Sequence, residues 1–173
     1  MRLEMGRGDD GLTDLLRGGR VLKTSPHVEA LGAIDEAIAA VGLARSLATD
    51  PGSAQRLAAV AEDLGKCAAE ISAPIGERAT RFDFGKAAQD VEEEVASIVE
   101  AKGQPAGFMT PGESSADAAL NLARTIVRRA ERRVFAIDWE DRAVYPLVAA
   151  YINRLSHLLF ALSYPGKQQS PPD

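Results

Sequence analysis

The stretch from Asn121 to Phe135 reads NLARTIVRRAERRVF, and its pattern predicts a helix with one apolar face. At about 100° per residue, the apolar side chains fall on a single stripe, which consists of Leu120, Ala123, Val127, Ala130 and Val134. Six charged residues border the stripe, with Arg124, Arg128, Glu131 and Arg132 on one flank and Arg129 and Arg133 on the other. The helix therefore carries arginines on both sides of a face that we expect to be buried.

Arginines beside a buried face are costly to desolvate unless an anion meets them. A polyphosphate suits them well, because a guanidinium offers a rigid fork of donors to phosphate oxygens. A solvated charged face is the alternative for any single arginine-rich helix. The stretch alone therefore leaves both a phosphate site and an ordinary surface open.

The composition indicates packed helices and argues against several classes of protein. Of the 173 residues, 46% are hydrophobic and only 5% are aromatic, which is typical of a helical domain rather than a sandwich or barrel. The net charge of −5 argues against nucleic acid and membranes as partners, so the arginines must act as a local patch. The single cysteine, Cys67, excludes an internal disulfide, and its spacing from Leu64 and Ile71 predicts a core position. With no signal peptide or long apolar run, we expect a cytoplasmic protein.

Five helices are predicted, and they indicate an all-α, five-helix up-and-down bundle in one domain, 1–173. The expected ranges are Pro26–Ala48, Ala54–Ser72, Ala87–Lys102, a helix that contains the opening stretch, and Ala143–Tyr164. Ser114 and Asp117 are expected to form a capping box for the fourth helix. The bundle spans residues 24–164, with long loops at 73–86 and 103–113, and the tail 165–173 is expected to be disordered.

Residues 1–23 lack a helical period, and five glycines interrupt them. Within this segment, the run from Gly8 to Thr13 reads GDDGLT and predicts either a loop whose amides face an anion or an ordinary surface turn. Asp35 and Glu36 lie at the border of the apolar face of the first helix. Each is either exposed or paired with an arginine.

Five motifs in this order resemble those of the PduO-type cob(I)alamin adenosyltransferases. They are Gly-Asp-x-Gly-x-Thr at 8–13, Glu-Ala-x-Gly-x-x-Asp-Glu at 29–36, Phe-x-x-Pro-Gly at 108–112, Ala-Arg-Thr-x-x-Arg-Arg-Ala-Glu-Arg at 123–132 and Asn-Arg-Leu-Ser at 153–156. Each motif is weak alone, but all five in register cover nearly the whole chain.

The resemblance implies a homotrimer with ATP bound between subunits, accompanied by Mg²⁺ that phosphate and water would hold. The reduced corrinoid (cobalamin) would attack the ribose C5′ of ATP through its Co(I) centre, and triphosphate would leave. The implied catalytic residues are Arg128, Arg132, Glu131 and Asp35, with Asp35 pairing with Arg128 across the trimer interface. The implied ATP-binding residues are Arg7, Gly8, Asp9, Gly11, Thr13, Lys23, Arg124, Asn153 and His157. The implied corrinoid-binding residues are Phe108, Met109 and Gly112. A flavoprotein reductase and an adenosylcobalamin-dependent enzyme are the implied protein partners.

The chain departs from the family pattern at three places. Met5 and Gly6 stand where a Thr-Lys pair is usual, Glu113 replaces a glycine, and His157 replaces an aspartate. An active adenosyltransferase is therefore one hypothesis, and a silent paralogue that only binds a nucleotide or a corrinoid is the other. The retained arginines favour the enzyme, whereas the missing Thr-Lys pair favours the binding module.

Overall fold

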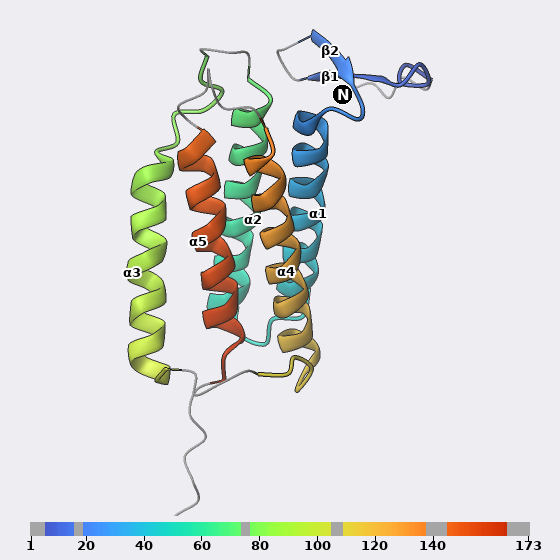
Figure 1. The fold of residues 1–173 in the computed structure, drawn as a ribbon. Helices are drawn as coiled ribbons and strands as arrows, with labels where there is room; N and C mark the ends of the chain where they lie inside the picture. Colours follow the sequence, from blue (N-terminus) through green and yellow to red (C-terminus); the bar gives the residue numbers. More distant parts are fainter. Residues whose placement is uncertain (1–5, 16–18, 74–76, 105–108, 138–144, 166–173) are drawn as a thin grey trace, which may run out of the picture.

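The chain folds into a bundle of five long helices, as a computed structural model shows (Figure 1). The structure describes residues 6–15, 19–73, 77–104, 109–137 and 145–165. The helices are α1 (Pro26–Ser46), α2 (Pro51–Ile71), α3 (Phe84–Lys102), α4 (Ser115–Phe135) and α5 (Tyr145–Ser163). Consecutive helices run in opposite directions, so the predicted up-and-down bundle is confirmed. The predicted disordered tail lies outside the described residues, except for Pro165.

Side-chain caps fix where the helices begin. Ser25 Oγ accepts a hydrogen bond from Val28 N–H at 3.4 Å, and Asp50 Oδ1 accepts one from Ser53 N–H at 2.8 Å. Asp83 caps α3 in the same way. Because of these two aspartates, α2 and α3 each begin three residues earlier than the apolar periodicity predicts.

One core runs between the helices. In the bundle α4 lies between α1 and α5, while α2 packs on α1 and α3 packs on α5. Each helix contributes fully or nearly fully buried apolar side chains, among them Ile34, Leu64, Val91, Val127 and Leu155, and each such side chain stabilises the fold by about 1.5–3 kcal/mol. Cys67 is buried here as predicted, and burial is the main cause that raises the pKa of its thiol. None of the described helices is long and apolar enough to cross a membrane.

A buried carboxylate anchors the connection from α2 to α3. The Glu70 side chain is 0% exposed, and its Oε1 lies 2.5 Å from Nε of Arg78. Its Oε2 accepts hydrogen bonds from the N–H and O–H groups of Thr80, at 3.1 and 3.2 Å. Among the described residues Oε1 makes no hydrogen bond, so its contact with Arg78 is ionic. The segment that precedes α3 is thereby tied to the end of α2.

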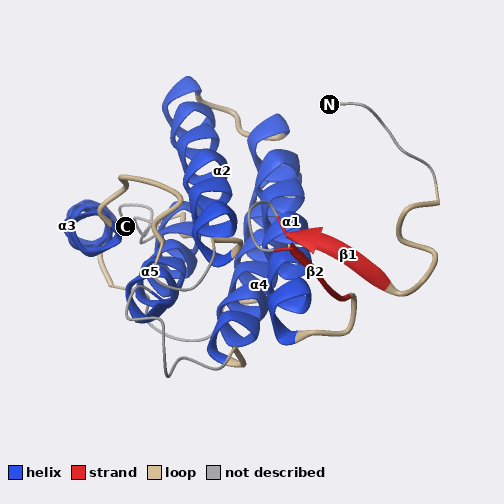
Figure 2. Ribbon diagram, turned by 90° about the horizontal axis from the view of Figure 1, so that it is seen from above, coloured by secondary structure: helices blue, strands red, loops and turns tan. Residues whose placement is uncertain are grey.

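A short β-hairpin precedes α1, and the sequence did not predict it. Strands β1 (Leu12–Leu15) and β2 (Gly19–Leu22) pair antiparallel, with Leu12 opposite Leu22. Neither segment, Leu-Thr-Asp-Leu nor Gly-Arg-Val-Leu, alternates apolar and polar residues, so no period of two could be recognised. The hairpin makes few contacts with the helices and extends sideways beyond the end of α1 (Figure 2).

Candidate active site

The two flanks of α4 differ in how their arginines are compensated. On the side of α1, Arg129 pairs with Glu36, and Arg133 Nη2 lies 3.7 Å from a carboxylate oxygen of Glu29. This outcome confirms the hypothesis that Glu36 has an arginine partner. The positive charge on this flank is therefore neutralised within the chain.

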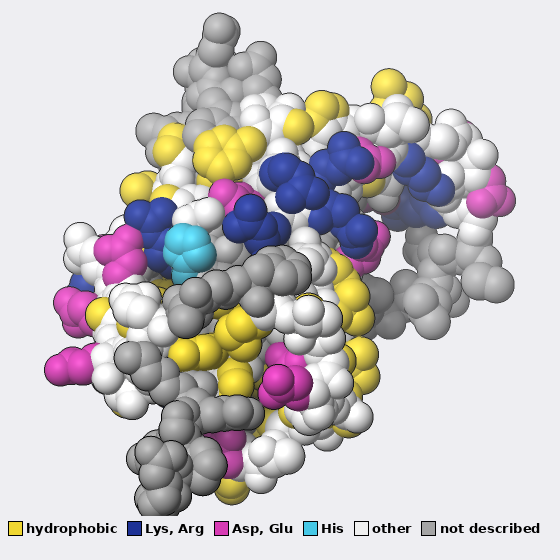
Figure 3. Space-filling model, turned by 60° about the horizontal axis from the view of Figure 1, so that its bottom comes forward, with side chains coloured by type: hydrophobic (Ala, Val, Ile, Leu, Met, Phe, Trp, Pro, Cys, Tyr) yellow, Lys and Arg dark blue, Asp and Glu magenta, His cyan; other side chains and the backbone are white. Residues whose placement is uncertain are grey.

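On the side of α5, the arginines lack such carboxylates. Arg132 Nη1 donates to the backbone carbonyl of Arg128 at 3.0 Å, and Arg124 Nε donates to the side-chain amide of Asn121 at 3.2 Å. Within the described part of the chain, neither these two nor Arg128 forms an ion pair. Arg128 and Arg132 are exposed. Figure 3 shows Lys and Arg side chains gathered in a band on one face of the molecule. In a protein of net charge −5, such uncompensated cations favour an anionic ligand.

Glu131 and Asn153 meet between α4 and α5. Asn153 Nδ2 donates to Glu131 Oε1 at 2.9 Å, and Arg154 Nη1 donates to Asn153 Oδ1 at 3.3 Å. Arg154 Nε in turn donates to Glu92 of α3 at 2.6 Å. The structure thus brings together two residues that the sequence placed in one site, and it fixes the amide of Asn153 from both sides.

The Gly8–Thr13 segment forms a turn followed by the first strand of the hairpin, instead of one simple loop. The N–H of Gly11 donates to the carbonyl of Gly8, and the N–H of Lys23 donates to the carbonyl of Gly11. A Cβ atom at Gly8 would lie only 2.8 Å from Nζ of Lys23, so the lysine side chain covers the turn. Thr13, in β1, pairs with Val21 of β2. The predicted ATP residues Gly8, Gly11 and Lys23 therefore lie together.

Ion pairs hold this hairpin in shape. Arg7 Nε lies 2.9 Å from Asp14 Oδ2, and Arg20 Nη2 lies 2.9 Å from Asp10 Oδ1. The pKa of Asp10 is lowered first by the hydrogen bond from Leu12 N–H and then by Arg20. Asp9 is exposed, and its own N–H donates to the carbonyl of Gly6. Arg7 thus already has a carboxylate neighbour within its own hairpin.

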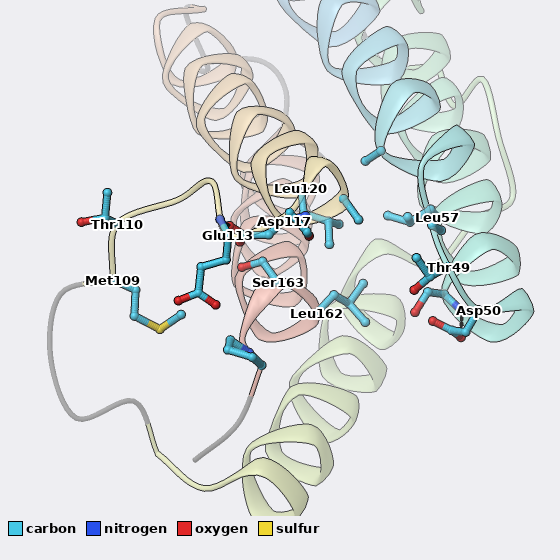
Figure 4. Close-up of a pocket in the computed structure, with 16 residues that line it drawn as sticks. Thr49, Asp50, Leu57, Met109, Thr110, Glu113, Asp117, Leu120, Leu162 and Ser163 are labelled. Atoms are coloured by element: carbon cyan, nitrogen blue, oxygen red, sulfur yellow. Dashed lines mark hydrogen bonds between the residues drawn. The ribbon is translucent and has the colours of Figure 1, made fainter. Parts of the chain in front are cut away.

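The predicted corrinoid loop lies at the opposite end of the bundle, before α4 (Figures 1 and 4). Phe108 lies outside the described residues, whereas Met109 lines a cavity of about 330 Å³. The ends of α1, α2, α4 and α5 complete its wall, and Figure 4 shows Glu113 and Asp117 on the same side as Met109. Gly112 has a φ of +118°, a conformation that favours glycine.

Asp117 does not close the predicted capping box. Ser114 Oγ accepts from Asp117 N–H at 3.0 Å, as expected, but the Asp117 carboxylate turns to the loop instead. It accepts the N–H groups of Gly112 and Glu113 at 2.6 and 3.2 Å. Asn121 then joins Asp117 to Arg124. Asp117 and Asn121 were not predicted as site residues from the sequence. The signal that could have identified Asn121 is its spacing, one turn before Arg124.

Two predicted site residues make no hydrogen bond or ion pair with the arginines of α4 in the described part of one chain. His157 is exposed on α5 and faces a groove between α5 and α3, which Val95 and Val99 also line. Asp35 is exposed on α1, and its carboxylate makes no hydrogen bond or ion pair among the described residues. Its predicted partner Arg128 is therefore not reached within one copy of the chain.

Comparison with known proteins identifies the family of the chain. The family model for cobalamin adenosyltransferase matches residues 3–164. A corrinoid adenosyltransferase of Mycobacterium tuberculosis is 39% identical over 168 residues, which cover 94% of this chain and 86% of that protein. One of Bacillus subtilis is 34% identical over 165 residues, covering 93% and 84%.

Solved structures give the same result for the fold. A variant PduO-type ATP:corrinoid adenosyltransferase from Lactobacillus reuteri, complexed with cobalamin and ATP, superposes with a TM-score of 0.85. It is 26% identical, and the match covers 94% of this chain and 92% of that one. The chain with the arginine-bearing α4 belongs to the cobalamin adenosyltransferase family.

Proposed function

We propose that this chain, a corrinoid adenosyltransferase by family, carries out its reaction at sites shared between copies of itself. The lone pair of Co(I) in a reduced corrinoid forms a bond to C5′ of ATP. The C5′–O bond breaks, its electrons leave with the triphosphate, and the cobalt carries the 5′-deoxyadenosyl group. Membership of the family and the ATP and cobalamin in the Lactobacillus reuteri complex support this reaction.

The uncompensated flank of α4 is the observation that carries the proposal. Arg124, Arg128 and Arg132 follow one another at intervals of four residues, about 6 Å along the helix. We assign Arg128 and Arg132 to the triphosphate, where negative charge grows as the C5′–O bond breaks. Fixed guanidiniums stabilise that growing charge more than they stabilise bound ATP, which lowers the barrier. The opposite flank has no such role, because the carboxylates of α1 already neutralise it.

Glu131 and Asn153 are assigned to the same nucleotide site. Their mutual hydrogen bond and the contact of Asn153 with Arg154 hold both side chains in one orientation. Glu131 lies one residue before Arg132, so its carboxylate limits the net positive charge between the arginines. We place Asn153 near the ribose, at the end of the triphosphate that reacts.

We infer a homotrimer, because one copy leaves the parts of the proposed site apart. The Gly8 turn and the Met109 loop lie at opposite ends of the bundle, separated by α4, whose 21 residues span about 30 Å. The hairpin also extends away from its own helices. A neighbouring copy brings a second hairpin to the arginine flank, and Asp35 of one copy then pairs with Arg128 of the next. Exposed apolar side chains on the outer faces of α1 and α4, Leu43 and Leu122, suit such a contact.

The substrates complete the proposal. Mg²⁺ arrives with ATP and is held by phosphate and water, while Lys23 and the Gly8 turn cover the phosphates. We assign Phe108, Met109 and Gly112 to the corrinoid, with Phe108 crowding its lower face so that the axial ligand leaves. A flavoprotein reductase would supply the electron that generates Co(I), and an adenosylcobalamin-dependent enzyme would accept the product.

The test is an anaerobic incubation with ATP, Mg²⁺ and chemically reduced cobalamin. We expect the adenosylcobalamin spectrum and one triphosphate per product. Arg128→Gln should lower the rate by about 10²–10³, whereas Arg133→Gln on the compensated flank should change it less than about twofold. ATP binding without any product would support the silent binding module instead.

A further inference from the structure

Asp117 joins two parts of the site that lie on different segments. Its Oδ2 accepts the N–H groups of Gly112 and Glu113, while its Oδ1 accepts Nδ2 of Asn121 at 2.8 Å. Both carboxylate oxygens are therefore engaged, one by the loop before α4 and the other by α4 itself. The carboxylate fixes the position of this loop relative to the helix.

The side-chain amide of Asn121 links Asp117 to Arg124, and it can do so in only one of its two orientations. Its side chain is buried, with 8% of the residue exposed, and its Oδ1 accepts Nε of Arg124 at 3.2 Å. A reversed amide would direct its NH₂ at the Arg124 donor and its oxygen at the Asp117 carboxylate, and both contacts would be repulsive. The charges on either side thus determine the orientation of the amide.

Asn121 and Phe160 together restrict the orientation of the Arg124 guanidinium. The Nε–H is occupied by Asn121, and Cζ lies 5.8 Å from the centre of the Phe160 ring. Neither terminal nitrogen has a hydrogen-bond partner in the described part of the chain. These two nitrogens are the pair that binds phosphate oxygens in a bidentate manner.

We propose that Asp117 and Asn121 are positioning residues, which set the Arg124 guanidinium for ATP and tie its orientation to the loop that ends at Glu113. The proposal rests on the proposed function, since it assigns Arg124 to the nucleotide. Neither residue touches a substrate. Their effect on ATP is exerted through Arg124, so it disappears when Arg124 is absent.

A double-mutant cycle on the full-length protein tests this dependence. ATP affinity is measured by calorimetry with Mg²⁺ and without corrinoid, for the parent, Asn121→Leu, Arg124→Met and the double variant. Asn121→Leu should weaken ATP binding about 5–20-fold, which is less than full loss of a charged hydrogen bond would cause, because a misplaced Arg124 keeps part of its contact with ATP. In the Arg124→Met background it should change affinity less than about twofold. The same factor in both backgrounds would overturn the proposal.

Two further variants distinguish a specific effect on ATP binding from a general folding defect. Asp117→Asn keeps an oxygen for the loop but offers an NH₂ to Asn121, which reverses its amide toward Arg124 and should weaken ATP binding in the same way. Asp83→Asn makes the same substitution at an aspartate that caps α3 and should leave ATP affinity unchanged. If Asp117→Asn binds ATP like the parent, Asp117 does not position Arg124 and the proposal is wrong, even though the enzyme is active. A parent protein that binds no ATP would remove the proposed function and this inference together.

Discussion

Replacing Gly8 by alanine tests whether the missing side chain at this position leaves room for the ammonium group of Lys23. The new Cβ would lie 2.8 Å from Nζ and 3.0 Å from Cε of Lys23, and 3.4 Å from the carbonyl oxygen of Leu12. Ordinary contact begins near 3.4 Å, so the end of the lysine must move by at least about 0.6 Å. The backbone at Gly8 has no positive φ, so alanine suits its conformation. The substitution therefore displaces one ammonium group and strains nothing else.

The expected consequence is weaker ATP binding without a loss of stability. A charged hydrogen bond contributes about 1.5–3 kcal/mol, and a displaced lysine retains part of it. We expect a loss of about 1 kcal/mol, or roughly fivefold in the Kd for MgATP measured by calorimetry. The free energy of unfolding should stay equal or rise slightly, because alanine has less freedom in the unfolded chain. Gly65→Ala in α2, where a Cβ meets nothing within 4 Å, is the matched control with unchanged ATP affinity.

The variant Lys23→Met tests whether displacement of Lys23 causes the weaker ATP binding of Gly8→Ala. Alone it should weaken ATP about 10–100-fold, and adding Gly8→Ala should then have no further effect. If Gly8→Ala weakens binding by the same factor in both backgrounds, the glycine permits close approach of the phosphates to the backbone. Contact with Lys23 would then not be the reason for a glycine at this position.

Three other predictions follow from the described contacts. Arg132→Lys keeps the charge but loses the planar fork, so kcat should fall about 10²–10³ while the Kd for ATP changes less than tenfold; an unchanged kcat would contradict the assigned role. Arg78→Met leaves the buried carboxylate of Glu70 without its cation and should cost about 2–3 kcal/mol in urea unfolding, below the usual range for buried pairs because Arg78 is 50% exposed. Lys86→Met, which breaks an exposed pair, should cost less than about 0.5 kcal/mol, and equal costs would show that burial of Glu70 is unimportant. The carboxyl of Asp10 should titrate by NMR below its ordinary value of 3.8, so its contribution to the hairpin is present above that pH and is lost as the pH falls through the lowered pKa; Arg20→Gln should raise the midpoint.

The apolar periodicity of the sequence predicted most of the bundle. Four of the five residues of the stripe along α4 are buried as expected, and Leu120 is partly buried. The two flanks of the stripe face α1 and α5, as the angular positions of Arg129 and Glu131 require. Helix starts were predicted less well, because Asp50 and Asp83 cap helices upstream of the first periodic apolar residue. A cap depends on one side chain and one backbone N–H, so it leaves no periodic signal.

The candidate site was predicted from the sequence only where its residues share one helix or adjacent helices. Glu131 and Asn153 meet because α4 and α5 pack side by side, which a bundle of this order requires. The role of Asp117 was missed because its spacing from Ser114 fits a capping box, whereas its carboxylate accepts loop amides that no helical period describes. The predicted pair of Asp35 and Arg128 stays a prediction, since it requires a second copy of the chain.

Mixing two inactive variants measures most directly whether the site is shared between copies. One variant, Lys23→Glu, has a defective hairpin and intact arginines, and the other, Arg128→Ala, has the reverse. After subunit exchange at equal amounts, random assembly of a ring places an intact hairpin against an intact Arg128 at about a quarter of the sites. The account therefore predicts recovery of about one quarter of the parent activity in forming adenosylcobalamin. No recovery, with exchange verified by native mass spectrometry, would place the whole site within one chain and contradict the account.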